Sequence, residues 1–424
     1  MTTAIPAPRL FGLILDANLR DHLLVTLWLF VTFKQFRGDE LLLYPLALYF
    51  VWAFVRDFPS LLDLIARSWI LWPVPIWALL SLSWGAETAQ IFKYGLQLLL
   101  TVMICYCIAL HLTGRQILLS LLFVAGFYGV LSVVTDANGG VAARGVFYSK
   151  NAMGGAMVLL WITALCTILD GGMRYAFRLA AVPAALLSLW LIEVSNSATA
   201  VLLAAGGLAV ILTMWAVMTL SMQAILSTIA FALAAIIFVA AWGALTLTEF
   251  DPISPVLKAF GKDSTLTGRT VLWNYAADEI ARDPWLGKGE GGFWTPRDGL
   301  STAHRIFVEF YKAPSSTFSF HNAYYEMAVR LGLIGMAFMI ASTAWCFLRI
   351  GFATLKTRGM PEIFFFCIAV VTLVRSFAES GHMEPFSLLS MLLVVGALKS
   401  LLIALPQKRP WPDRSVTQTP VRQI

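Results

Sequence analysis

Long apolar stretches alternate with short polar segments along most of the chain. Apolar stretches of about 17–25 residues fit helices that cross a membrane better than helices buried in a soluble protein. The pattern predicts an all-α, polytopic transmembrane bundle of about twelve helices, near residues 19–36, 41–55, 68–84, 95–112, 116–134, 152–169, 176–194, 199–220, 223–247, 323–348, 361–378 and 385–404. Residues 41–55 and 68–84 are short, so the count is open by one or two.

One long polar segment, residues 248–320, separates the ninth apolar stretch from the tenth. It divides the chain into an N-terminal membrane part (1–247), a loop or lid (248–320), and C-terminal membrane helices with a tail (321–424). A loop of about 70 residues with helical patterning of its own is usually functional rather than a simple connection. We therefore expect the loop to carry part of a site.

The loop contains one predicted amphipathic helix. Leu272, Ala276 and Ile280 recur at the spacing of a single helix face. Thr267 is a plausible N-cap, and Pro284 lies where the helix should end. The glycine-rich run "GKGEGG" after it predicts a turn.

The charges are few and unevenly placed. Lys, Arg, Asp and Glu make up 13% of the chain, against roughly 25% in an average soluble domain. If the N-terminus is cytoplasmic, the short loops outside the cytoplasm hold only Lys34, Arg37, Lys93, Arg144 and Lys150. This bias predicts that both termini are cytoplasmic and that the long loop lies outside the cytoplasm. The N-terminus lacks the pattern of a signal peptide, so none is expected to be removed. The net charge of +6 thus reflects topology, and nucleic-acid binding is not expected.

Arg269 falls in the first turn of the predicted loop helix. Backbone N–H groups and the helix dipole attract anions to this position, and a guanidinium binds phosphate through two hydrogen bonds. The segment therefore has the features of an anion-binding lid. An arginine that merely faces water remains the alternative.

A second polar constellation, "HNAYYEMAVRLGLIG" (321–335), lies where the loop re-enters the membrane. His321 is a candidate general base, with an interfacial histidine as the alternative. Asn322 is a candidate helix cap, and the spacing of Glu326 and Arg330 predicts an ion pair.

Two further polar constellations fall on the same side. In "RGVFYSKNAMGG" (144–155), Arg144 and Lys150 can attract phosphate or contact lipid head groups, and Ser149 or Asn151 can cap the next helix. Arg375 lies inside an apolar run, one helical turn before Glu379. We expect either that the two form an ion pair that holds the bundle together or that Arg375 lines a site.

Several motifs are missing from the sequence. It has no D-x-D pair, no Walker A sequence, no G-x-S-x-G and no zinc-type Cys/His spacing. We therefore expect neither a metal nor a cofactor, and ATP-driven transport loses support.

Taken in order, "RGVFYSKNAMGG", "TGRTVLW…DPWLGKGEGGFW" and "HNAYYEMAVRLGLIG" resemble the O-antigen ligase and exopolysaccharide polymerase superfamily, and most closely its exopolysaccharide polymerases. The resemblance implies an inverting, metal-independent glycosyltransferase of the GT-C type. Its donor would be an oligosaccharide on undecaprenyl pyrophosphate, used at the periplasmic face of the bacterial inner membrane. It makes His321 and Arg269 catalytic, and it implies substrate contacts from Arg144, Lys150, Asn151, Asn322, Trp273, Arg375 and Glu379.

The function expected from this resemblance is polymerisation of lipid-linked repeat units into exopolysaccharide or O-antigen. The nearest alternative is a ligase that transfers the glycan to lipid A-core, and a transporter or flippase is a third. Expected partners are the lipid-linked donor, a glycan or lipid A-core acceptor, membrane lipids, a chain-length regulator and a flippase. The sequence leaves the sugars, the linkage and the oligomeric state open.

Overall fold

The computed structural model describes residues 9–10, 13–14, 17–135, 143–219, 268–295, 301–313 and 318–404. The predicted span at 223–247 and the predicted cap Thr267 lie outside these residues. The described elements, in chain order, are β1 (Arg9–Leu10), β2 (Leu13–Ile14), α1 (Ala17–Phe33), α2 (Glu40–Arg67), the 3-10 helix η1 (Trp69–Leu71), α3 (Pro73–Leu80), the 3-10 helix η2 (Ser81–Ser83), α4 (Thr88–His111), α5 (Gly114–Thr135), α6 (Lys150–Leu169), α7 (Tyr175–Val194), α8 (Ala198–Thr219), α11 (Arg269–Arg282), α12 (Thr302–Glu309), α13 (Ala323–Thr357), α14 (Met360–Ser376) and α15 (Leu388–Ala404).

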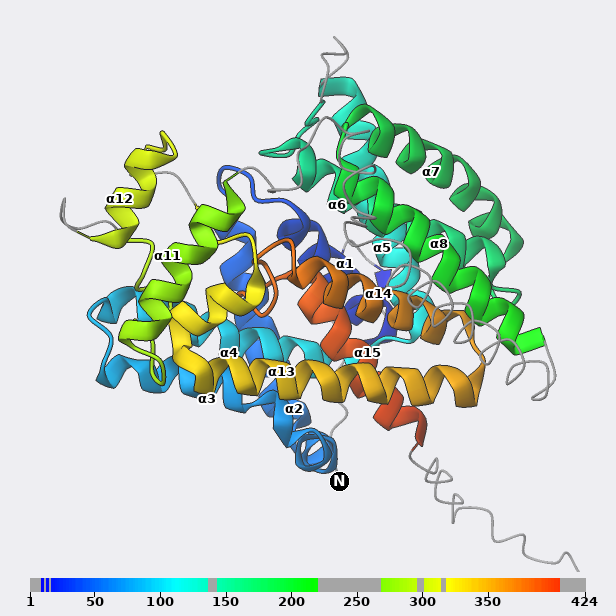
Figure 1. The fold of residues 1–424 in the computed structure, drawn as a ribbon. Coiled ribbons are helices and arrows are strands. Elements are labelled where there is room, and N and C mark those ends of the chain that lie inside the picture. The colour runs from blue at the N-terminus through cyan, green and yellow to red at the C-terminus, as the bar shows by residue number, and fades with distance from the viewer. Residues whose placement is uncertain are drawn as a thin grey trace, which may run out of the picture.

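The all-α, polytopic membrane fold predicted from hydropathy is confirmed. Every predicted apolar stretch within the described residues coincides with helical structure (Figure 1). Among those residues, seven helices are long and apolar enough to cross a membrane, and shorter apolar helices accompany them. The stretch 68–84 forms η1, α3 and η2 in succession rather than one continuous helix.

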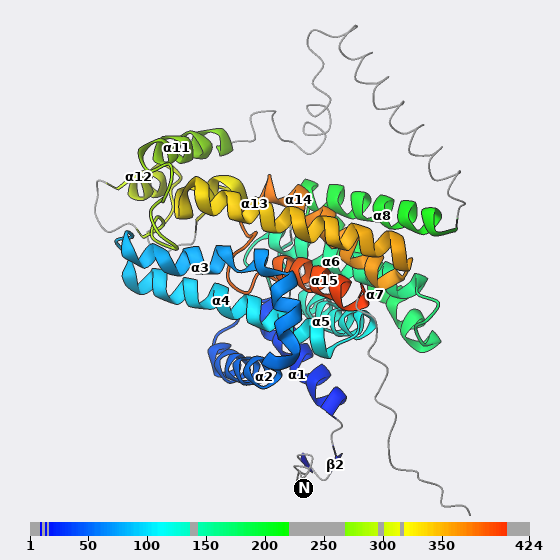
Figure 2. The same ribbon diagram turned by 90° about the horizontal axis from the view of Figure 1, so that it is seen from below.

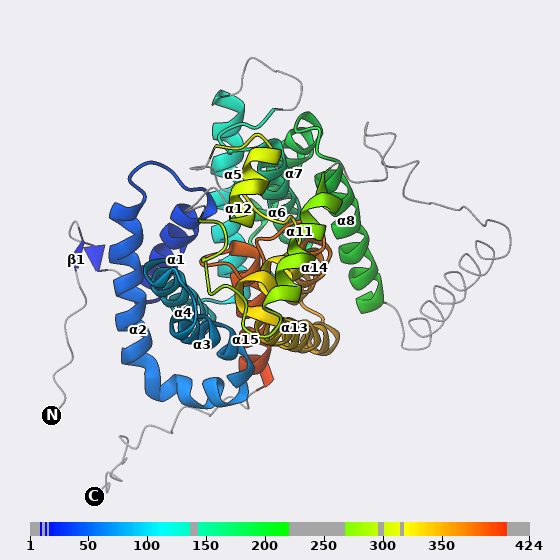
Figure 3. The same cartoon turned by 60° about the vertical axis from the view of Figure 1, so that its left-hand side comes forward.

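Helix α2 extends well past the predicted end at residue 55. The charged residues that follow are paired: Arg56 contacts Asp57 at 2.6 Å, and Asp57 contacts His111 of α4 at 2.7 Å. This pairing reduces the cost of charges next to an apolar helix. The helix changes direction along its length (Figure 3), and it contains Pro45 and Pro59, each of which removes one backbone hydrogen bond.

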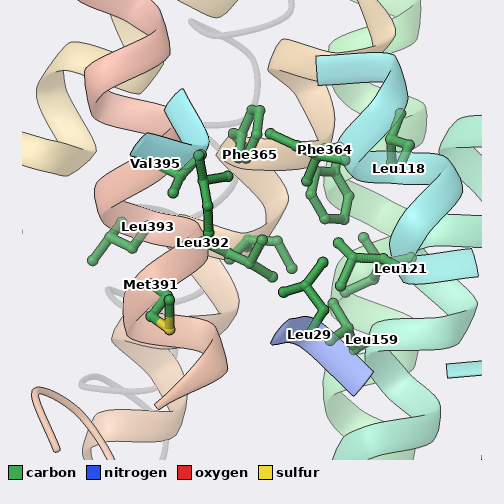
Figure 4. Close-up of a cluster of buried hydrophobic side chains, with 14 of the residues drawn as sticks. Leu29, Leu118, Leu121, Leu159, Phe364, Phe365, Met391, Leu392, Leu393 and Val395 are labelled. Atoms are coloured by element: carbon green, nitrogen blue, oxygen red, sulfur yellow. The ribbon is translucent and has the colours of Figure 1, made fainter. Parts of the chain in front are cut away.

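The main hydrophobic core lies between α1, α5, α6, α14 and α15. Figure 4 shows Leu29 of α1 facing Leu121 of α5 and Leu159 of α6, with Phe364 of α14 beside them. Small residues allow the closest helix contacts, as expected in lipid, where packing rather than exclusion of water drives association. Gly207 of α8, for example, lies against Ile162 and Cys367.

The described part of the predicted loop, residues 268–295, 301–313 and 318–320, forms a cap at one end of the bundle, where α11 and α12 lie beside the start of α13 (Figures 1 and 2). The predicted amphipathic helix is α11, with Leu272 and Ala276 buried. These two residues pack with Phe293, Ile306 and other apolar side chains into a core separate from that of the bundle. Gly268, with φ of 84°, precedes the helix.

A break in α13 attaches the cap to the bundle. Gly332 has φ of 70° and ψ of −178°, which interrupts the helix. In a continuous helix, the carbonyls of residues 329–331 would accept bonds from the N–H groups four residues later. Here the bonds around the break come from other segments: Lys288 N–H to the Val329 carbonyl (3.0 Å), Gly289 N–H to the Arg330 carbonyl (2.9 Å), Trp77 Nε1–H to the Leu331 carbonyl (3.0 Å), and Leu333 N–H to the Pro284 carbonyl (2.7 Å). The turn at 284–290 is thus inserted into the helix break.

A buried ion pair reinforces this attachment. Arg330 Nη2 donates to Glu290 Oε1 at 2.5 Å, and both side chains are less than a tenth exposed. The predicted pair between Glu326 and Arg330 is therefore wrong. Glu326 instead accepts bonds from the Trp294 indole (2.7 Å) and from the Phe320 N–H (3.0 Å), because the cap covers this face of α13.

We predict that Gly287→Ala destabilises the protein. Gly287 has φ of +69°, and an added Cβ would lie 2.6 Å from the Gly332 nitrogen and 2.7 Å from two carbonyl oxygens. The left-handed conformation alone costs about 1–2 kcal/mol for a non-glycine residue, and the contacts add to this. Thermal unfolding of the purified protein in detergent measures the loss.

Gly126→Ala is the matched control, because an added Cβ on this helical glycine meets no atom within 4 Å. Equal unfolding temperatures for the two variants would contradict the inserted turn.

Candidate functional site

Contacts between distant segments bring the predicted polar constellations to one end of the bundle. The loop before α6 joins the α7–α8 connection, where the Ala143 N–H donates to the Val194 carbonyl at 3.1 Å. The start of α13 joins the α14–α15 loop, where Asn322 Nδ2 donates to the Phe377 carbonyl at 3.4 Å. Residues 34–35, 146–148 and 379–390 line one common cavity.

Glu379 is the point where the predicted catalytic residues meet. Arg269 Nη2 lies 3.7 Å from one of its carboxylate oxygens, and His321 Nδ1 lies 3.4 Å from the other. Burial alone would raise the pKa of the Glu379 carboxyl. The hydrogen bond from His321 and the charges of Arg375, His321 and Arg269 outweigh that effect and hold this pKa below its usual range.

His321 is held in an unusual backbone conformation. Its φ is 52°, in the left-handed region that non-glycine residues rarely adopt. Neighbouring bonds fix this geometry: the Trp273 indole donates to the Phe320 carbonyl at 3.0 Å, and the His321 N–H donates to Ser319 Oγ at 3.4 Å. Strained residues persist where the surroundings over-determine them, and they concentrate at functional sites.

Two other predicted residues support this geometry. Trp273, expected to contact substrate, also stacks on Tyr325 with ring centroids 5.9 Å apart. Asn322 caps α13 as predicted, since its Oδ1 accepts bonds from the N–H groups of Tyr324 (2.9 Å) and Tyr325 (3.2 Å). Both therefore fix the segment that carries His321.

A cavity of about 740 Å³ lies next to Glu379. Ala152, Gly155, Ala156 and Leu159 line it from one face of α6, and the small side chains leave the space open. Leu159 lies nine residues after the start of α6, which corresponds to a depth of roughly 13 Å along the helix. The remaining lining includes Phe33, Tyr148 and Phe386 as aromatics, and Lys34, Arg375, Glu379, His382 and Glu384 as ionisable residues.

Arg375 faces this cavity from α14. Its guanidinium packs on α6 at Gly155, where an added Cβ would lie 3.2 Å from Nη1. Within the described residues, Glu379 forms its ion pairs with Arg269 and His321. The expected Arg375–Glu379 ion pair is not among them, and the charge of Arg375 only helps to lower the pKa of Glu379. The site-lining alternative for Arg375 is the one that the geometry favours.

The predicted residues around the start of α6 make other contacts. Ser149 is the helix cap, accepting from the Ala152 N–H at 3.1 Å. Lys150 Nζ donates to the Asn196 carbonyl (3.2 Å), and Asn151 Oδ1 accepts from Ser197 Oγ (3.0 Å). Arg144 is exposed in the loop that supplies Tyr148 to the cavity. Lys150 and Asn151 thus hold the start of α6 against the α7–α8 connection.

Lys34, Tyr148 and Glu384 line the cavity, although no site role was predicted for them. From the sequence alone, Lys34 is only one of the few cations expected outside the cytoplasm. Its position at the end of an apolar stretch, like that of Arg144 before one, was the available signal.

His382 and Glu384 have opposite pKa shifts in the loop that follows α14. Burial lowers the pKa of the His382 imidazole to about 4, and the ring lies between Thr343 Oγ1 (2.7 Å) and Ser390 Oγ (3.1 Å). Burial raises the pKa of the Glu384 carboxyl to about 7. Between pH 6.5 and 4 the unfolded chain binds a proton at His382 that the folded protein lacks. Between pH 4.5 and 7 the folded protein keeps a proton at Glu384 that the unfolded chain releases.

We predict opposite changes in the pH dependence of stability when these residues are replaced. Glu384→Gln leaves the His382 effect uncompensated, so its stability falls more steeply than that of the wild type from pH 6.5 to 4, by up to about 3 kcal/mol. His382→Gln leaves the Glu384 effect, so its stability rises relative to wild type as pH falls from 7 to 4.5. Unfolding curves of the three proteins at several pH values give the slopes, and parallel curves would refute the assignment.

Comparisons with known proteins agree with the motifs. Residues 183–340 match the family model described as O-Antigen ligase. This range includes α11, α12 and the start of α13, and therefore Arg269 and His321. The chain is 29% identical over 386 residues to the exopolysaccharide production protein ExoQ of Rhizobium meliloti (strain 1021), which covers 86% of this chain and 84% of that protein. The two matches confirm the resemblance seen in the motifs and support the O-antigen ligase and exopolysaccharide polymerase family for this multi-pass membrane protein.

Proposed function

We propose that the protein is an inverting, metal-independent glycosyltransferase of the GT-C type that polymerises undecaprenyl-pyrophosphate-linked repeat units into exopolysaccharide or O-antigen. The observation that carries the proposal is the convergence of Arg269 and His321 on Glu379, beside a cavity that Arg375 also lines. The similarity to an exopolysaccharide production protein adds support for the product.

The local charge suits a pyrophosphate. Arg269, Arg375 and Lys34 carry three positive charges near the cavity, whereas Glu379 carries one full negative charge. Glu384, with a pKa of about 7, is only partly ionised at neutral pH. The excess of positive charge stabilises the charge that develops on the leaving pyrophosphate. Arg144, in the neighbouring loop, is proposed to extend this contact to the donor.

The proposed reaction exchanges one C–O bond for another. The acceptor hydroxyl attacks C1 of the donor sugar from the face opposite the pyrophosphate, and undecaprenyl pyrophosphate leaves with the bonding electron pair. When His321 is neutral and its Nδ1–H donates a hydrogen bond to Glu379, Nε2 stays free to accept the proton of the hydroxyl. Glu379 then orients the imidazole and stabilises its charged form, and Trp273 and Asn322 hold the backbone around it.

The second candidate function is transfer of the glycan to lipid A-core, which the description of the matched family model favours. It uses the same donor and the same chemistry and differs only in the acceptor.

The proposed location is the bacterial inner membrane, with the site facing the periplasm and both termini in the cytoplasm. The bias of Lys and Arg towards the loops at the other end of the bundle supports this orientation. A flippase that delivers the donor and a chain-length regulator are the proposed protein partners.

We predict that purified protein in lipid, given undecaprenyl-pyrophosphate-linked repeat units and no other acceptor, yields a ladder of longer glycans. His321→Ala should slow ladder formation about 10²–10⁴-fold because the proton acceptor is lost. Arg269→Ala should slow it about 10²–10³-fold because a contact to the leaving group is lost. Products resolved by size give the rates.

His304→Ala and Arg305→Ala are matched controls, because both residues lie on α12 of the same cap. Both should retain the wild-type rate. If the donor stays unchanged on its own but is consumed once lipid A-core is added, the result would support the ligase instead. Full activity of both site variants at normal expression would exclude the assignment of Arg269 and His321.

A further inference from the structure

Two cations of the cavity, Lys34 and Arg375, lack a carboxylate partner. Lys34 Nζ donates to the carbonyl of the adjacent Gln35 at 3.2 Å. Within the part of the chain that the structure describes, neither cation forms an ion pair, and the cavity carboxylate Glu379 is engaged by Arg269 and His321. A cation at the edge of a closed apolar region normally has a counter-charge nearby.

The other titratable groups of the cavity do not supply that counter-charge in full. Burial raises the pKa of Glu384 to about 7 and lowers that of His382 to about 4. Both ring nitrogens of His382 are hydrogen-bonded to hydroxyl groups, those of Thr343 and Ser390. At neutral pH the cavity therefore keeps an excess of positive charge.

The position of Lys34 is fixed by aromatic packing. The preceding residue, Phe33, stacks on Tyr128 with ring centroids 5.3 Å apart and an interplanar angle of 7°. Phe33 also lies 6.3 Å from Phe147, which belongs to the loop that contributes Tyr148 to the cavity. The end of α1 thus packs on the loop before α6, which places the backbone of Lys34 at the cavity wall.

Arg375 is equally constrained. Its guanidinium packs against Gly155 of α6, a position where an alanine Cβ would press on Nη1. The two cations come from α14 and from the end of α1, elements far apart in the sequence that line one cavity of about 740 Å³. The hydroxyls of Thr32, Thr372 and Ser376 also line the cavity, but each already donates to a backbone carbonyl of its own helix, so the two cations are the lining groups that suit an anion.

We propose that Lys34 and Arg375 form a binding site for an oxyanion of the substrate, in addition to the contact made by Arg269. The inference rests on the proposed function, because the oxyanion belongs to the lipid-linked glycan. It has two sources with one chemistry: the pyrophosphate of the donor, or a carboxylate carried by a sugar of the glycan. The proposed function uses Lys34 only through its charge, whereas this inference gives it a direct contact to the substrate.

Binding to the full-length protein in nanodiscs of neutral phosphatidylcholine tests the site, measured for three probes. These are undecaprenyl pyrophosphate without a glycan, a soluble oligosaccharide containing a uronic acid, and the neutral oligosaccharide of the same length. Lys34→Gln should weaken binding of the probe that carries the oxyanion by about tenfold, the effect of one charged hydrogen bond. The effect should shrink at high salt, because screening weakens the charge contact.

Arg37→Gln is the matched control, since it removes the same charge from the same loop at an exposed residue outside the cavity lining. Arg375→Lys, which keeps the charge, should bind better than Arg375→Gln. Weaker binding of undecaprenyl pyrophosphate identifies the leaving group as the source, and weaker binding of the uronic acid probe identifies the glycan.

Equal binding of every probe by Lys34→Gln and Arg37→Gln would overturn the inference. That failure is separate from failure of the proposed function, which shows itself as an absent ladder or as full activity of Arg269→Ala.

Discussion

The insertion of the turn at 284–290 into the break of α13 is the contact on which the candidate site depends. The cap has a small apolar core of its own, and its attachment to the bundle relies on backbone hydrogen bonds at the break and on the Arg330–Glu290 pair. α11 packs on α13, so this attachment also sets where Arg269 stands relative to Glu379. A shift of about 1 Å in such a contact changes how well reacting groups are oriented.

Around Glu379, burial and charge act in opposite directions. Burial disfavours the carboxylate, and the surrounding cations favour it more strongly. The result is one negative charge that holds an imidazole and a guanidinium in place while leaving an excess of positive charge next to the cavity. In the proposed reaction, the same arrangement would orient the base and attract the anionic leaving group, two needs of glycosyl transfer from a pyrophosphate.

Hydropathy and helix periodicity predicted the existence of the helices, the amphipathic helix α11 and the placement of the polar constellations at one end. They succeeded because each depends on residues close together in the sequence. The same reasoning paired Glu326 with Arg330 and ended α2 too early, because the true partners, Glu290, Trp294 and His111, lie on other segments. Lys34 remained unassigned for the same reason: α1 packs against α2, α4, α5 and α15, and periodicity along α1 does not specify these neighbours.

Three main-chain hydrogen bonds attach the cap at the helix break, and the Arg330–Glu290 and Trp294–Glu326 contacts add side chains to the attachment. Glycines are required where the two backbones approach most closely, at Gly287 and Gly332. The docking therefore depends on these close backbone contacts and on a few fixed side chains, and it leaves the exposed side chains of the cap without a part in it. A protein built in this way can vary the exposed surface of its cap while the cap keeps one position on the bundle. Under the proposed function, a single scaffold would then serve glycans of different composition.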